Sequence, residues 1–193
     1  MMRLPLPTAT LLVLTLASGR AAMAAEDLPP DRQAALMLRV LPYDRNLRER
    51  APEAVTIAVL YREGRAESEA YGLDMAAALQ DAARGAQIRG LPVRIVSIPY
   101  ASPEALEAAV SRSQVTAVYF CPGLTDAEES ILGVTQRYKV LSFSGRESDV
   151  RQGLSIGLLR RGSKAGLLVN LRAAIAEGAE LQPEMLAVSE VLR

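Results

Sequence analysis

The chain has 193 residues, of which 50% are hydrophobic and 23% are charged, so its composition is that of one folded domain rather than a disordered chain. Lysine plus arginine and aspartate plus glutamate both count 22, a balance that argues against nucleic acid as the main partner. The absence of histidine and the single cysteine exclude histidine-based catalytic dyads and triads and most zinc sites. We therefore expect a protein that is not an enzyme and carries no cofactor or metal.

Residues 1–24 have the layout of a secretory signal peptide. Arg3 precedes an apolar core at residues 11–17, and Ala22-Met23-Ala24 forms a small-residue cleavage site. The alternative is a membrane anchor, but this apolar run is well short of the roughly 20 residues that span a bilayer. The sequence thus predicts a cleaved signal peptide, a mature domain at residues 25–193, and localisation in the periplasm.

The mature domain begins with strands and helices in alternation. We expect a mobile leader at residues 25–31, then a helix that begins at Asp31 and ends or kinks at Pro42. Helical spacing follows at residues 68–84, after Ser102-Pro103, and after Thr125-Asp126-Ala127-Glu128, which reads as a capping box. Between these helices lie apolar runs of strand length, typical of strands covered on both faces, at Val55–Leu60, Val93–Ile98, Val115–Phe120 and Lys139–Phe143.

The last quarter of the chain has a different pattern. Leu154–Leu159 and Gly166–Leu171 are two expected strands joined by a link so short that they must form an antiparallel hairpin. Two short helices are expected to follow, near Leu171–Glu177 and Pro183–Leu192. The predicted fold is α/β: a single-domain, Rossmann-like three-layer sandwich whose mostly parallel sheet ends in a C-terminal antiparallel hairpin.

Three groups of residues were weighed as sites of chemistry. Residues 157–164 have the glycine spacing of a phosphate-binding loop, but the order of Ser163 and Lys164 is reversed and the segment joins two strands, so an exposed hairpin tip is preferred. A serine–lysine enzyme is disfavoured because Lys139 and Lys164 are the only lysines available to Ser142, Ser144 and Ser148. The carboxylates of Glu104, Glu107, Glu128 and Glu129 are interpreted as solvated helix faces.

The best candidate for a ligand or partner cleft comes from topology. In open α/β sheets, ligands bind beyond the C-terminal ends of the parallel strands. Turns between strands and helices also require glycine, proline and serine, so ordinary turns are the simpler interpretation of the same residues. The predicted cleft residues are Tyr61, Tyr100, Pro122, Gly123, Ser144 and Gly145.

The layout resembles the YfiR-like family of periplasmic proteins, which includes the YfiR and HmsC regulators. The resemblance is carried by Gly153–Gly157, by Gly166–Leu171 with its Asn-Leu ending, and by Ala174, Gly178 and Leu186. It extends to the segments Tyr43–Leu47, Gly90–Val93 and Cys121–Leu124, and so covers most of the mature chain.

The resemblance implies a regulatory role. Members of the family inhibit an inner-membrane diguanylate cyclase by binding its periplasmic sensor domain, which connects them to cyclic-di-GMP signalling, adhesion and biofilm. The implied partner is therefore the periplasmic domain of a membrane sensor or cyclase, or another membrane receptor, and a homodimer remains open. The alternative function is a small-molecule-binding module that resembles one lobe of a transport-associated binding protein.

The resemblance also implies paired cysteines that respond to the oxidising periplasm, and this chain departs from that pattern because Cys121 is its single cysteine. At the end of an expected central strand, a thiol packs as a small hydrophobe. We predict that a Cys121→Ser variant still folds and is exported, and that reductants change neither stability nor partner binding. A covalent dimer on non-reducing gels, or a melting temperature that falls when a reductant is added, would overturn this prediction.

Overall fold

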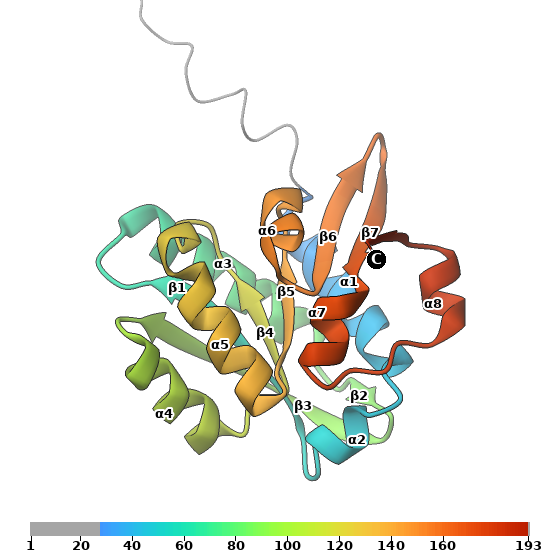
Figure 1. Cartoon of the computed structure of the whole chain (residues 1–193), viewed down its shortest axis with the longest axis horizontal. Coiled ribbons are helices and arrows are strands. Elements are labelled where there is room, and N and C mark those ends of the chain that lie inside the picture. Colours follow the sequence, from blue (N-terminus) through green and yellow to red (C-terminus); the bar gives the residue numbers. More distant parts are fainter. Residues whose placement is uncertain (1–27, 193) are drawn as a thin grey trace, which may run out of the picture.

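A computed structural model describes residues 28–192, so the predicted signal peptide lies outside the described residues. The fold consists of an eight-stranded sheet with helices on both faces, which confirms the predicted α/β class (Figure 1). The spatial order of the strands is β2-β3-β1-β4-β5-β6-β7-β8. Their bounds are β1 Val55–Arg62, β2 Gln87–Ile88, β3 Leu91–Tyr100, β4 Ala117–Phe120, β5 Leu141–Ser144, β6 Ile156–Arg161, β7 Lys164–Asn170 and β8 Glu190–Leu192.

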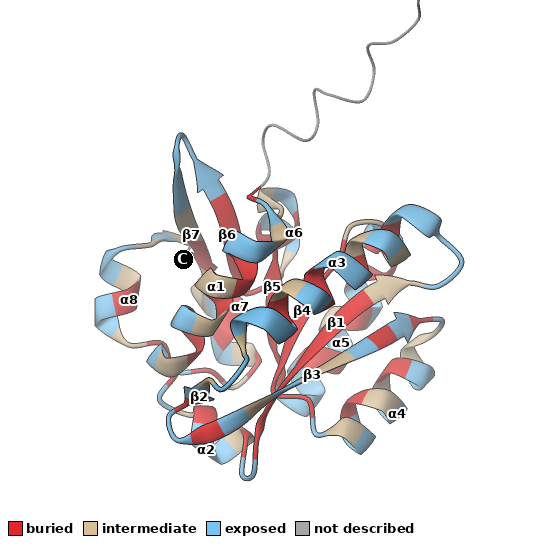
Figure 2. Cartoon of the chain, turned by 180° about the vertical axis from the view of Figure 1, so that it is seen from behind, coloured by how far each residue is buried: buried red, intermediate tan, exposed pale blue. Residues whose placement is uncertain are grey.

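The helices cover the sheet from two sides. Helices α1 and α3 lie on one face and α4 and α5 on the other, as the two opposite views show (Figures 1 and 2). None of the helices in residues 28–192 combines the length and apolar composition needed to cross a bilayer. The bounds are α1 Pro30–Val40, α2 Leu47–Arg50, α3 Ala66–Ala82, α4 Pro103–Ser113, α5 Glu128–Tyr138, α6 Glu147–Gln152, α7 Leu171–Ala176 and α8 Pro183–Ala187, with 3₁₀ turns η1 Leu41–Tyr43 and η2 Thr125–Ala127.

Strand β1 is the point at which the chain changes direction across the sheet. It pairs in parallel with β3 on one side and with β4 on the other, while β4 pairs in parallel with β5 and β5 with β6. Helix α3 leaves β1 on one face, and the α4 crossover to β4 lies on the opposite face. Such a reversal is a topological switch point, where doubly wound sheets open a crevice.

The central strands bury both of their faces, as their uninterrupted apolar runs predict. Alternate residues of β1 contribute to two separate cores: Ile57 and Val59 pack with α1 and α3, and Ala58 and Leu60 pack with α4 and α5. Strand β3 is partly exposed, since β2 pairs only with Leu91 and Pro92 and leaves the rest of that edge open (Figure 2).

Several element bounds differ from the sequence prediction. The hairpin strands meet at a two-residue turn, Gly162-Ser163, because the ladder continues through the polar tips to the pair formed by Arg161 and Lys164. The expected helix over residues 183–192 ends at Ala187, and residues 190–192 form β8, which satisfies backbone groups along β7. The expected mobile leader is ordered from Leu28, whose side chain is buried.

A buried ion pair connects segments near the two ends of the described chain to the N-terminal ends of β4 and β5. The carboxylate of Asp44 is fully buried and bonds to Arg50, and it also accepts hydrogen bonds from the backbone N–H groups of Asn46 at 3.0 Å and Glu180 at 2.9 Å. The Arg50 guanidinium donates to the carbonyls of Thr116 and Lys139, both at 2.8 Å. The pair thus joins η1 and α2 to the starts of β4 and β5 and to the segment before α8.

This ion pair gives a stability prediction. Removing the carboxylate in Asp44→Ala leaves the Arg50 guanidinium buried without its counter-charge, so we expect the free energy of unfolding to fall by about 3–5 kcal/mol in urea titrations. Asp81→Ala is the matched control, because Asp81 pairs with Arg84 on an exposed helix face and such pairs contribute at most about 1 kcal/mol. Equal losses in the two variants would contradict the role of Asp44.

Candidate functional site

The two predicted cleft tyrosines lie at the C-terminal ends of β1 and β3 and take part in packing. Tyr61 lies against α3, where a Cβ on Gly72 would approach its Cβ and ring to 3.0 Å, so a larger residue at position 72 would require Tyr61 to shift. Tyr100 is buried, and the Arg62 guanidinium lies 5.2 Å above the centre of its ring. This cation–π contact orients Arg62, which also pairs with Asp126 at the start of the next crossover.

Ser144 and Gly145, at the end of β5, are covered by protein. The Ser144 hydroxyl is buried and donates to Asp149 at 2.5 Å. Gly145 lies under Gln33 of α1, whose side-chain oxygen would stand 2.6 Å from a Cβ at this position. Gln33 accepts from the Tyr119 hydroxyl at 2.5 Å and also contacts the Tyr71 hydroxyl, so this triangle holds α1 over the strand ends.

The structure brings the other two predicted residues, Pro122 and Gly123, into one pocket at the switch point between β1 and β4. The pocket has a volume of about 290 Å³. Ser68 fixes its floor, because its hydroxyl donates to the Pro122 carbonyl at 2.6 Å and accepts from the Arg62 N–H at 2.9 Å. The lining is completed by the first turn of α3, so the residues around the pocket are Arg65, Ala66, Glu67, Ser68, Pro122 and Gly123.

Gly123 is required at this turn for two reasons. Its φ of +94° is a conformation that other residues rarely adopt, and a Cβ would lie 3.3 Å from the Ser68 Cβ. A helix N-terminus beside such a turn presents unpaired N–H groups and a partial positive charge. The Arg65 side chain adds a positive charge to the lining and the Glu67 carboxylate adds a negative one, so the arrangement favours a small polar ligand that carries an anionic or carbonyl oxygen and a donor group.

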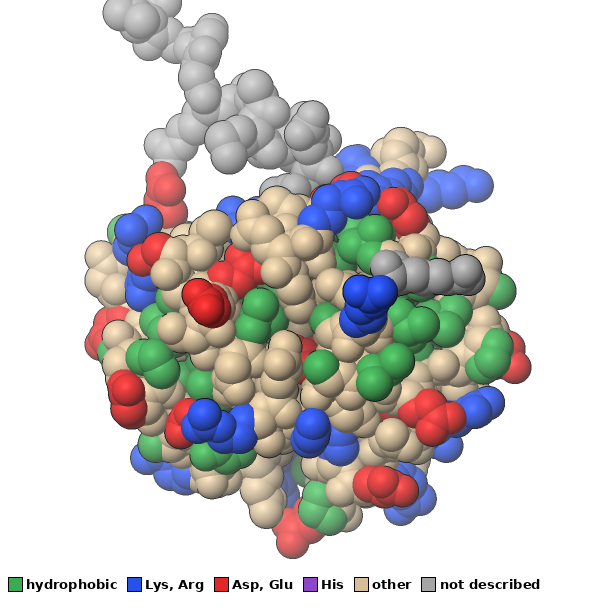
Figure 3. Space-filling view, in the orientation of Figure 1, with side chains coloured by type: hydrophobic (Ala, Val, Ile, Leu, Met, Phe, Trp, Pro, Cys, Tyr) green, Lys and Arg blue, Asp and Glu red, His purple; other side chains and the backbone are tan. Residues whose placement is uncertain are grey.

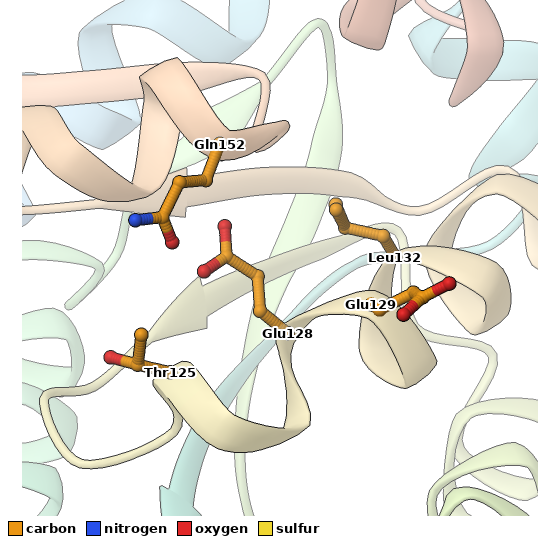
Figure 4. Close-up of a pocket in the computed structure, with 5 residues that line it drawn as sticks. All are labelled: Thr125, Glu128, Glu129, Leu132 and Gln152. Carbon is orange, nitrogen blue, oxygen red and sulfur yellow. The ribbon is translucent and has the colours of Figure 1, made fainter.

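A second pocket, of about 300 Å³, lies between the start of α5 and the end of α6 and was not expected from the sequence (Figure 4). Glu128 is only 5% exposed, and its carboxylate points toward the Gln152 amide across the pocket. Neither of its carboxylate oxygens has a hydrogen-bond partner among the described residues. The pocket is lined by Thr125, Glu128, Glu129, Leu132 and Gln152.

Glu128 is the clearest departure from the sequence interpretation, which placed it in a capping box and on a solvated helix face. Residues 125–127 form a 3₁₀ turn, so α5 begins at Glu128 itself and Thr125 makes no side-chain cap. Instead, the Thr125 hydroxyl accepts a hydrogen bond from Arg146 at 3.0 Å. The 3₁₀ turn therefore positions Glu128 to face the pocket. The capping-box pattern Thr125-Asp126-Ala127-Glu128 does not reveal this position by itself.

Burial raises the pKa of Glu128 to about 7, with the nearby negative charge of Asp149 acting in the same direction and Arg146 opposing it. Asp149 is itself held by Arg146, whose Nε lies 3.1 Å from both of its carboxylate oxygens. Of the two carboxylates, Asp149 is therefore paired with an arginine, whereas Glu128 has no such partner among the described residues.

A third carboxylate, Glu177 at the end of α7, is completely buried against the starts of β5 and β6. Its Oε2 accepts hydrogen bonds from the backbone and hydroxyl of Ser142, at 2.8 and 3.0 Å, and from the Ser155 hydroxyl. Burial raises the pKa of Glu177, and these bonds oppose the shift. Ser142, which was weighed as a nucleophile, therefore donates its hydroxyl proton to a structural carboxylate.

The sequence matches the YfiR/HmsC-like family over residues 31–190. The match covers nearly the whole described chain, and it includes the segments around Asp44, Gly123 and Glu177. No curated protein matches the sequence.

Solved structures with a similar fold have low sequence identity to this chain. An ABC domain from Streptococcus pneumoniae in complex with L-Trp has a TM-score of 0.60 and 14% identity, and the match covers 86% of this chain and 63% of that one. A conserved domain protein from Vibrio cholerae has a TM-score of 0.60 and 16% identity, and the match covers 86% of this chain and 61% of that one. A ligand-free, open substrate-binding protein with adhesive properties from Clostridium difficile has a TM-score of 0.55 and 13% identity, and the match covers 77% of this chain and 57% of that one. This chain therefore spans about 60% of the length of these structures.

The raised pKa of Glu128 predicts a pH dependence of stability. Between the ordinary pKa of 4.5 and the folded value of about 7, the folded state holds a proton that the unfolded state has released, so stability falls as pH rises through this window. We expect Glu128→Gln to be as stable as the wild type near pH 4 and more stable by up to about 3 kcal/mol at pH 8.

Urea titrations of both proteins from pH 4 to pH 8 measure this difference. Subtracting one profile from the other removes the contribution of Glu177, which has the same sign. A difference that does not change with pH would show that Glu128 titrates normally.

Proposed function

The chain belongs to the YfiR/HmsC-like family, and we propose that it is a non-catalytic periplasmic regulator that binds the periplasmic domain of an inner-membrane sensor. The family match over residues 31–190 is the observation that carries this proposal. The finer form of the proposal is that the partner is a diguanylate cyclase, so that binding adjusts cyclic-di-GMP signalling and, through it, adhesion and biofilm.

The candidate nucleophiles in the described chain are engaged in structural contacts, which supports a role without serine or cysteine catalysis. The hydroxyls of Ser142 and Ser144 donate to buried carboxylates. The Cys121 thiol is buried at the end of β4, and burial raises its pKa, so the nucleophilic thiolate is disfavoured. Lys139 donates to the Ala176 carbonyl just before the start of β5, at the opposite end of the parallel strands from the C-terminal ends where ligands bind.

Binding to another protein requires accessible side chains, and the three most exposed large hydrophobic ones among the described residues are Leu73, Ile175 and Val188, ahead of Tyr43 and Tyr138. Ile175 on α7 and Val188 after α8 are 62% and 77% exposed. Hydrophobic side chains also gather over the C-terminal elements on the face of the molecule that Figure 3 shows. Leu73 is 69% exposed on α3, which packs on β1 and β3, whereas α7 packs on β7 and β8 at the other end of the strand order. Isolated exposed residues are common in monomeric proteins, so an experiment must compare these regions.

The proposal predicts a specific membrane partner. A photo-crosslinking amino acid at position 73, 175 or 188, in cells that produce the protein at its native level, should capture an inner-membrane protein with a periplasmic domain from at least one position. Because Leu73 and the pair Ile175 and Val188 lie in different regions, a specific contact crosslinks from one region and not from the other. Failure to capture any membrane protein from all three positions would contradict the proposal.

The alternative function is a small-molecule-binding module, and the switch-point pocket favours it. The pocket lies where doubly wound folds bind ligands, and similar solved structures include one described in complex with L-Trp. In a thermal-shift screen against amino acids, sugars and purines, a ligand of this pocket should raise the melting temperature. Ala66→Trp, which fills the pocket, should abolish that shift, whereas Ala70→Trp, one turn further along α3 and outside the lining, should preserve it.

A further inference from the structure

The pocket between α5 and α6 contains a buried carboxylate, that of Glu128, to which no described residue donates a hydrogen bond. A buried polar group without a hydrogen bond lowers stability, and the cost is larger for a charged group. Both oxygens of Glu128 are in this situation, although the residue lies at the border of a pocket rather than within the hydrophobic core. A ligand that brought N–H donors and a positive charge would remove the cost.

The charged groups around the pocket leave a net negative charge. On the α6 side, Arg146 is engaged with Asp149 through Nε and through Nη2, which lies 2.6 Å from Oδ1, so this pair is close to neutral. On the η2 side, Asp126 is paired with Arg62. The carboxylates of Glu128 and Glu129 then remain on α5 itself. A cation is therefore the charge that fits.

The donor set favours an organic cation over a metal ion. The described residues contain no group of three aspartate, glutamate, cysteine or histidine side chains that could hold a metal. The pocket instead combines the Glu128 carboxylate and the Gln152 amide with the apolar side chain of Leu132 (Figure 4). Its volume of about 300 Å³ is at the lower end of the range for small-molecule sites. Gln152 is exposed, so it can change rotamer to admit a ligand without disturbing the core.

We infer that this pocket binds a small organic amine in its protonated form, with the ammonium or guanidinium group on Glu128 and a short apolar body against Leu132. Binding gives the Glu128 carboxylate a charge-assisted hydrogen bond, which no described residue of the free protein provides. The ligand and a proton compete for the same carboxylate, so affinity increases with pH. The site is separate from the switch-point pocket and does not depend on the proposed membrane partner.

Four probes with short alkyl chains of three or four carbons test this inference by NMR titration of the purified protein: butylammonium, butylguanidinium, butanol and butyrate. Either cation should shift the amide signals of residues 125–132 and 152, with an affinity at least about tenfold higher than that of butanol or butyrate. Glu128→Gln should weaken cation binding by at least about tenfold. The matched control is Glu104→Gln, the same change in the exposed first turn of α4, which should leave the affinity unchanged.

The pH dependence gives a second measurement. Between pH 6 and pH 8 the ionised fraction of a group with a pKa of about 7 rises roughly tenfold, so the affinity of wild type should rise by about the same factor, and that of Glu128→Gln should not. Equal affinities for the cations and butanol, equal affinities of wild type and Glu128→Gln, or no shifts with cation on the order of tens of millimolar would each overturn the inference.

Discussion

The ion pair between Asp44 and Arg50 is the interaction on which the packing of the irregular segments against the sheet depends. Neither residue belongs to the sheet, yet Arg50 bonds to the carbonyls at the starts of β4 and β5, and Asp44 binds the backbone before α8. Segments separated by more than a hundred residues in the chain therefore meet at one buried charge. Because a buried pair destabilises the fold strongly when one partner is lost, the positions of α2, α8 and the strand edge are coupled.

Glu177 extends the same principle to the C-terminal segment. It is the last residue before the turn at Gly178, and its carboxylate binds Ser142 and Ser155 near the starts of two adjacent strands. Buried carboxylates thus fix the irregular ends of the chain to the regular sheet at both places. The glycine and asparagine pattern that suggested the family in this region accompanies these contacts, since Asn170 caps α7 through the Ala173 N–H.

The sequence predicts the central architecture well because hydrophobic periodicity decides it. The parallel pairing of the four predicted strands, the helix cap at Ser102 and the antiparallel hairpin all follow from local pattern. The expected burial of both faces holds for β1, β4 and β5 but not for β3, which is partly exposed at the edge of the sheet. The candidate site was only partly predictable. Pro122 and Gly123 were found from the switch-point rule, whereas the role of Gln33 in covering Gly145 depends on a helix that lies more than a hundred residues earlier. Glu128 was missed because a capping box and a pocket-facing carboxylate share the same residue order.

The edges of the sheet limit how this protein can join another. One edge is β3, whose open part carries Pro99, a residue without an N–H to offer, and the other is β8, which spans only residues 190–192. The edge at β8 offers only three residues for strand addition, whereas residues 93–100 of β3 leave their outer edge open, with Pro99 near its end. A partner strand can therefore pair along β3 but not along β8, and any other contact is made by side chains on the helices and loops, where surface substitutions change specificity and leave the fold intact.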